Sequence, residues 1–223
     1  MCVDISYNKV HYQAHARPSC SVLIKNNNGV TNEVAMSWGV VMDFMLRDAD
    51  QLKKFGNNMF NARIEKLGDN NSVWHRLINN RCLLVADGIF EHQHKANYNK
   101  KIPYFISLKS KKQMLLPAIY APTLPGYSVS TFAILTRPAN ELMKTIHNDG
   151  PNKHRMPLFM EPEMARNWLN LAVDVSDFLS YEIPSENLAA HSVYTIRNNA
   201  IRPDGKDKTD YYNWDLNEQA TLF

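Results

Sequence analysis

Cys2 follows the initiator methionine, so removal of Met1 would leave a cysteine at the start of the chain. An N-terminal cysteine carries a thiol and an α-amine on adjacent carbons, and this pair can close a five-membered thiazolidine ring on an aldehyde. The reference pKa is about 7.7–8.0 for an α-amine and about 8.5 for a thiol, so both groups offer nucleophilic forms near neutral pH. Cys2 is therefore the first candidate for chemistry, and the alternative is an exposed, inert thiol.

The composition is that of a globular protein, with 223 residues, of which 44% are hydrophobic and 21% charged. No apolar run approaches the ~20 residues of a membrane span, and the N-terminus lacks the pattern of a signal peptide. The chain has three cysteines, Cys2, Cys20 and Cys82, and their spacing is not that of metal ligands. An odd number argues against a disulfide framework and therefore favours a reducing compartment. We expect a cytoplasmic protein with no membrane partner.

The net charge of +3 permits a nucleic-acid partner without requiring one. Lysines cluster at residues 53–54, 95–101 and 109–112. Solvated loops are the alternative explanation for each cluster.

Apolar runs typical of strands fill the first two-thirds of the chain. They are Ser21–Lys25, Glu33–Val41, Arg81–Phe90, Ile102–Leu108, Met114–Tyr120 and Val129–Thr136. Helical patterns are fewer, at Ala49–Phe55, Val73–Asn79, Pro138–His147 and Pro162–Leu179. This mixture predicts an α+β fold with a curled antiparallel β-sheet, barrel-like at its core, and a few peripheral helices. From about His191 the sequence turns polar, so we expect one domain over residues 1–190 and a polar, mobile tail over residues 191–223.

Several segments, taken in order, resemble the SOS-response-associated peptidase family. They are Met1-Cys2, Ser37-Trp38-Gly39, Asn61–Glu65, Arg81–Glu91, Ile102–Phe105, Phe132–Thr136, Ala139-Asn140, Ile146-His147 and Arg155–Pro157. The resemblance spans roughly residues 1–180. It implies a DNA-damage protein that removes Met1 by autoproteolysis and then traps abasic sites in single-stranded DNA through a thiazolidine at Cys2. The implied enzyme is an autopeptidase, a hydrolase, with crosslinking and lyase-like activity.

The resemblance also implies roles for further residues. Glu91 ends a long apolar run, so burial should raise its pKa and suit it to general acid–base catalysis. Asn61 would hold the Cys2 amine, although it could equally cap a helix. The implied DNA contacts are Arg63 and Arg155 to phosphates and Trp38 and Met156 to bases. Pairing of Arg63 with Glu65, and core packing of Trp38 and Met156, are the alternatives.

The sequence departs from the family pattern at two places. Val3-Asp4 stands where the family has Gly-Arg, which removes a phosphate contact and places an acid near Cys2. Residues 148–154 separate Ile146-His147 from Arg155, which are nearly adjacent in the family. Two histidines therefore compete for one catalytic role: His147 keeps the Ile-His context, whereas His154 keeps its place beside Arg155. We favour His147.

Neither a metal nor a cofactor is expected, because Cys82 and His92-Gln93-His94 lack convincing further ligands. We expect a monomer. Gln219–Phe223 resembles the Gln-x-x-Leu-Phe peptide that docks on bacterial sliding clamps, although Leu222-Phe223 could instead pack on the domain. Two other functions remain open, a non-catalytic single-stranded-DNA-binding module and a thiol-dependent processing peptidase.

Overall fold

The computed structural model describes residues 4–26, 28–56, 58–96, 98, 100–197 and 200–215. Cys2 and Gln219–Phe223 lie outside these described residues. No described helix is long and apolar enough to cross a membrane.

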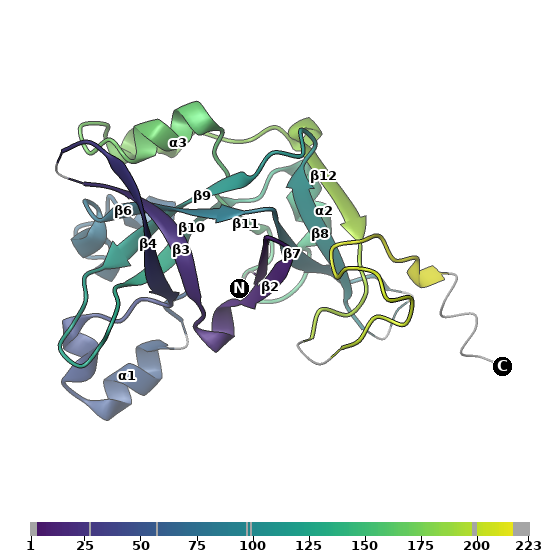
Figure 1. Cartoon of the computed structure of the whole chain (residues 1–223), viewed down its shortest axis with the longest axis horizontal. Coiled ribbons are helices and arrows are strands. Elements are labelled where there is room, and N and C mark those ends of the chain that lie inside the picture. The colour runs from purple at the N-terminus through teal and green to yellow at the C-terminus, as the bar shows by residue number, and fades with distance from the viewer. Residues whose placement is uncertain are drawn as a thin grey trace.

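One sheet of the described chain curls until it closes on itself (Figure 1). Its strands are β3 (Ser19–Lys25), β4 (Thr31–Trp38), β5 (Asn61–Arg63), β6 (Arg81–Ala86), β9 (Met114–Ala121), β10 (Thr131–Pro138) and β11 (Arg155–Pro157). The order is β11-β10-β4-β3-β6-β9, and β9 pairs again with β10. Most pairs are antiparallel, whereas β10 runs parallel to β4 and β5. The predicted α+β fold with a curled, barrel-like core is confirmed.

A second, antiparallel sheet lies beside the closed one, in the order β12-β8-β7-β1-β2. Its strands are β1 (Asp4–Tyr7), β2 (Val10–Gln13), β7 (Gly88–Gln93), β8 (Ile102–Leu108) and β12 (Leu188–Ser192). The sequence pattern missed β1 and β2, whose residues are only partly apolar.

The apolar run Arg81–Phe90, expected as one strand, is divided between the two sheets. β6 ends at Ala86 in the closed sheet, and β7 begins at Gly88 in the second sheet. A Cβ atom at Gly88 would collide with the Phe105 ring and the Ile106 carbonyl, so only glycine fits at this crossing. Both halves are buried, and for this reason hydrophobicity alone could not locate the break.

The described α-helices are α1 (Ala49–Gly56), α2 (Glu141–Ile146) and α3 (Pro162–Trp168). α1 agrees with its sequence pattern to within one residue, whereas α2 and α3 are shorter than theirs. α2 starts late because β10 continues to Pro138 and the Asn140 side chain caps the helix by accepting from the Met143 amide, at 3.0 Å. Short 3-10 helices form at Ala14–Ala16, Asp43–Leu46, Ile64–Lys66, Val73–Leu77, Val175–Phe178 and Ser185–Asn187.

The described residues beyond His191, where the polar composition predicted a mobile tail, pack against the domain. Val193 and Ile196 are buried in a cluster with Phe90 of β7 and Phe105 of β8. Residues 200–215, yellow in Figure 1, fold back against this side of the second sheet, where the buried Trp214 donates to the Val193 carbonyl at 2.9 Å. We call residues 193–197 and 200–215 the C-terminal lobe.

Candidate active site

Glu91 projects from β7, an inner strand of the second sheet. β7 pairs with β8 and β1, in a register that sets Glu91 opposite Tyr104 and Phe90 opposite Asp4. The side chain is 5% exposed, and its Oε1 has no hydrogen-bond partner among the described residues. Burial raises the pKa of Glu91 to about 8, and the nearby Asp4 carboxylate adds to the rise. Glu91 is thus a neutral acid at pH 7, as its place at the end of an apolar run predicts.

His147 is the C-cap residue of α2 and is also buried, at 8% exposed. Its Nδ1 lies 2.8 Å from the Arg155 carbonyl oxygen. Because a carbonyl only accepts, Nδ1 carries the hydrogen and Nε2 is left unprotonated in the neutral ring. Burial lowers the pKa of His147, which favours that neutral ring near pH 7. Nε2 can therefore accept a proton.

Glu91 and His147 line one cavity of about 220 Å³. His92 and Lys101 lie at its edge, and residues 149–152 close the remaining side. An acid and a base with oppositely shifted pKa values in one cavity are typical of a catalytic site.

The structure separates the two competing histidines. His154 is exposed, has a left-handed backbone with φ of 61°, and meets His147 only through its amide, which donates to the His147 carbonyl at 2.9 Å. His147 is the one that lines the cavity with Glu91.

The segment that separates the two histidines is bound to the second sheet. Asn148 exchanges two hydrogen bonds of 2.9 Å with the backbone of His94. Asp149 forms an ion pair of 2.8 Å with Lys101. This departure from the family pattern therefore builds a wall of the cavity. The lysine cluster of residues 95–101 was visible in the sequence, but the pairing of Lys101 with Asp149 was not, because the two residues are remote in the chain.

Asn61 and Arg63 lie on β5, which pairs with β10. Neither is among the described residues that line the cavity of Glu91 and His147. Asn61 is half-buried at the start of the strand and does not cap a helix, whereas Arg63 is exposed and can reach a phosphate.

Arg155 is engaged within the protein. Its two terminal nitrogens donate to the Glu65 carboxylate at 2.7 and 3.0 Å, and one also donates to the Thr136 carbonyl at 2.9 Å. Glu65, the alternative partner for Arg63, is thus paired with Arg155. The Arg155 backbone carbonyl also accepts the hydrogen bond from His147. A contact of Arg155 with a phosphate stays a prediction, and it would require the guanidinium to exchange the half-exposed Glu65 carboxylate for the phosphate.

Trp38 and Met156 are both wholly buried. The Trp38 indole stacks on Phe132 and donates to the Phe60 carbonyl at 2.9 Å. Neither side chain can stack on a DNA base from these positions, which corrects the expected base contacts in favour of core packing.

Asp4 does not face solvent as a bare acid. Its carboxylate accepts from His11 Nε2 at 3.0 Å, and both side chains are largely buried. The His11 ring packs edge-on against Phe90, at 5.0 Å between centroids. Asp4, which stands at the sequence position of the family's arginine, is thus directed into the protein.

The other two cysteines are buried on β3 and β6. Burial raises the pKa of Cys20 to about 12 and raises that of Cys82 further. Both are therefore thiols rather than thiolates at neutral pH, and neither competes as a nucleophile.

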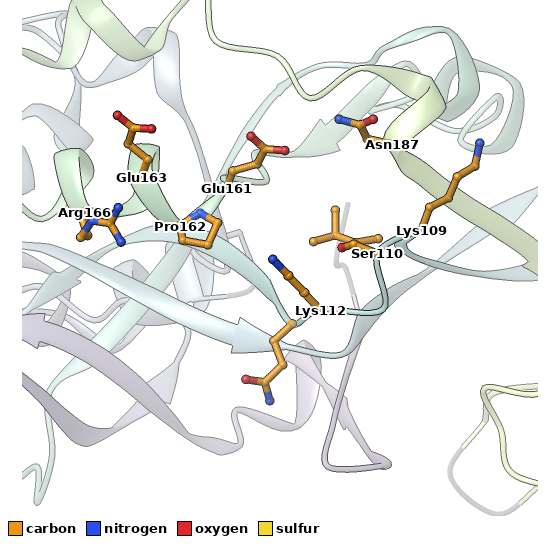
Figure 2. Close-up of a pocket in the computed structure, with 10 residues that line it drawn as sticks. Lys109, Ser110, Lys112, Glu161, Pro162, Glu163, Arg166 and Asn187 are labelled. Carbon is orange, nitrogen blue, oxygen red and sulfur yellow. The ribbon is translucent and has the colours of Figure 1, made fainter.

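A second cavity, of about 530 Å³, lies between the β8–β9 connection and the start of α3 (Figure 2). Lys109 and Lys112 line one side and Glu161 and Glu163 the other, so its charge is mixed. It contains none of the predicted site residues. Within the described chain, no group of three or more His, Cys, Asp or Glu residues could hold a metal ion.

The fold and the site together define a small α+β protein with a buried acid–base pair. The family model described as SOS response associated peptidase (SRAP) matches residues 5–200, and the chain belongs to this family. It is 28% identical over 204 residues to the abasic site processing protein YoaM of Bacillus subtilis, covering 88% of this chain and 85% of that one. It is 30% identical over 194 residues to the Bacillus subtilis abasic site processing protein YobE, covering 84% and 83%. A crystal structure of a protein from Bacteroides thetaiotaomicron shares the fold, with a TM-score of 0.73, 24% identity and coverage of 92% and 84%.

Proposed function

We propose that this protein processes abasic sites in single-stranded DNA by covalent capture at Cys2. The observation that carries the proposal is the cavity shared by Glu91 and His147, beside a strand that begins two residues after Cys2. Two residues span at most about 7 Å, and Asp4 pairs with Phe90, the neighbour of Glu91. A link of this length would allow Cys2 to reach the acid. The names of the relatives YoaM and YobE support the same substrate.

In the proposed reaction, Met1 is first removed by autoproteolysis. An abasic deoxyribose then opens to an aldehyde at C1′, with Glu91 protonating the ring oxygen. The Cys2 α-amine adds to the aldehyde to give a carbinolamine, which loses water to form an imine. The Cys2 thiolate adds to the imine carbon and closes the thiazolidine, so that one water leaves for each adduct formed.

The remaining residues would assist this sequence. Asn61 would hold the Cys2 amine, and Arg63, which is exposed, would contact a phosphate. His147 Nε2 would accept a proton when the crosslink reverses, or its protonated form would donate one to a leaving 3′-phosphate.

The direct test uses the purified protein and a single-stranded oligonucleotide with one abasic site. A denaturing gel should show a slower band that depends on the abasic site. A protein that binds the DNA without a stable band would be the non-catalytic binding module. Cleavage of an unrelated polypeptide without any DNA adduct would support the processing peptidase.

We expect different outcomes for matched asparagine variants of the two histidines. His147→Asn keeps a donor for the Arg155 carbonyl but removes Nε2, and should slow crosslink reversal and strand cleavage by roughly 10²-fold. His154→Asn preserves the left-handed backbone, which asparagine tolerates, and should behave as wild type. Release of oligonucleotide from the purified adduct measures both. A larger loss in His154→Asn would reverse the assignment.

We also propose that Gln219–Phe223 docks on the sliding clamp. The described lobe ends at Asp215, next to the buried Trp214, and residues 216–218 precede the motif, so they would serve as a short tether that presents the two apolar residues to a clamp. Deleting residues 219–223 should abolish clamp capture in a pull-down and leave melting temperature and crosslinking of short oligonucleotides unchanged. A drop in melting temperature would indicate that Leu222-Phe223 packs on the domain, and docking would be rejected.

A further inference from the structure

A second groove, of about 610 Å³, continues from the cavity of Glu91 and His147. It runs between the start of β8 and the C-terminal lobe, and it shares His92 and Lys101 with the cavity. The cations Lys100 and Arg197 line the groove beyond this shared edge. No described lining residue is acidic, unlike the mixed-charge cavity of Figure 2. We call this the basic groove.

The lobe wall that carries Arg197 is anchored to the second sheet, because Ile196 is buried against Phe90 and Phe105. A buried arginine holds the adjoining part of the lobe together. Arg202, whose side chain is 4% exposed, donates to the backbone carbonyls of Asp207 and Tyr211 at 3.1 and 2.6 Å and makes an ion pair with Asp204 at 2.6 Å. Lys208 of this segment donates to the Arg197 carbonyl at 3.4 Å and so links the two parts of the lobe.

The opposite wall presents its lysines in ways that a phosphate can exploit. Lys100 Nζ lies 4.4 Å from the centroid of the Trp214 ring, which holds the ammonium at the groove. Lys101 pairs with Asp149, but both side chains are about half exposed, at 45% and 48%. Exposed pairs of this kind contribute little, so Lys101 can turn to a phosphate at small cost.

We propose that the basic groove binds the phosphodiester backbone of the strand on one side of the abasic nucleotide, with the C-terminal lobe as a DNA-binding element. This inference rests on the proposed function, since the abasic nucleotide must occupy the adjoining cavity. The cations of the basic groove follow one another away from the cavity of Glu91 and His147. Such a row can pair with the regularly spaced phosphates of a nucleic-acid backbone. The lobe extends to residue 215, beyond the residues 5–200 that the family model covers.

The test removes charge while keeping a polar side chain that can donate a hydrogen bond. The double variant Lys100→Gln/Arg197→Gln is compared with Lys109→Gln/Lys112→Gln, which loses the same charge at the mixed-charge cavity. The probes are single-stranded oligonucleotides with a stable tetrahydrofuran abasic analogue and ten nucleotides on both sides, only on the 5′ side, or only on the 3′ side. Equilibrium binding is measured between 50 and 200 mM salt, and melting temperature verifies folding.

On a single strand, two phosphate contacts contribute about 1.4 to the slope of the logarithm of the binding constant against the logarithm of the salt concentration. Their loss corresponds to a decrease of roughly 10- to 30-fold in affinity at 0.1 M salt. We expect the groove variant to lose this slope and affinity on the two-sided probe and on one of the one-sided probes, and to match wild type on the other. The double variant Lys100→Arg/Arg197→Lys keeps both positive charges and should bind all three probes as wild type does.

Equal losses in the control variant, or equal losses on both one-sided probes, would overturn the proposal, because the effect would then be general electrostatics. An unchanged slope would overturn it as well. The analogue cannot form an aldehyde, so these measurements do not depend on crosslinking. A failure of covalent capture with natural abasic DNA would therefore be visible separately.

Discussion

Cys2→Ala should abolish the covalent adduct with abasic DNA. Alanine retains the α-amine and can form the imine, but without the thiol the ring cannot close and the imine hydrolyses. The other described cysteines cannot substitute, because Cys20 and Cys82 are buried thiols. The measurement is the fraction of shifted DNA on a denaturing gel after reaction of wild type and variant with one abasic oligonucleotide.

Melting temperature provides the control, and it should not change, since a residue so close to the chain terminus contributes little to packing. Intact-mass analysis of the wild-type adduct should show that Met1 has been lost. A normal yield from Cys2→Ala would identify a lysine as the nucleophile. An adduct that retains Met1 would likewise contradict the proposed chemistry.

Glu91→Gln should slow Met1 removal and crosslinking by roughly 10²-fold or more, the usual effect of losing a general acid–base group. Glutamine has the size of glutamic acid but cannot transfer the proton. Single-turnover rates for wild type and variant measure the effect. In wild type the capture rate should fall above about pH 8, where Glu91 ionises. The residual rate of the variant should not show this decrease, because glutamine does not ionise.

The same substitution should stabilise the protein at alkaline pH. The pKa of Glu91 is raised from 4.5 to about 8 in the folded state, so the unfolded chain releases its proton first. The contribution of Glu91 to stability is therefore complete below pH 4.5 and is lost as the pH rises toward 8. Glutamine does not titrate, so the variant's advantage in the free energy of unfolding should grow by roughly 2–4 kcal/mol between pH 5 and pH 9.

Denaturant unfolding at both pH values measures this difference. A catalytic loss together with a pH-independent difference in stability would mean that Glu91 is not buried as a neutral acid. A variant that loses stability at both pH values would indicate that glutamine disturbs the packing of β7.

The family, the fold class and the main candidates for chemistry could all be predicted from the amino-acid sequence. Hydrophobic runs marked most strands, because burial on one or both faces leaves a local pattern. Glu91 could be identified as a buried acid since it ends such a run. The packing of the described residues after His191 was not predicted for the same reason. Their polar sequence has no regular spacing of apolar residues, because the buried guanidinium of Arg202 holds much of the segment together through hydrogen bonds.

The surroundings of the remaining candidate residues depend on how the chain folds. His147 and His154 are seven positions apart with similar local context, and the turn of residues 148–153 places one against Glu91 and the other in solvent. The ion pair of Arg155 with Glu65 forms because β11 brings together residues that are 90 positions apart, and Trp38 is enclosed by the closed sheet, which rules out stacking on a base. Residue type sets what a side chain can do, but its pKa, its partners and its exposure arise from contacts between strands that are distant in the chain, and these exist only in the folded protein.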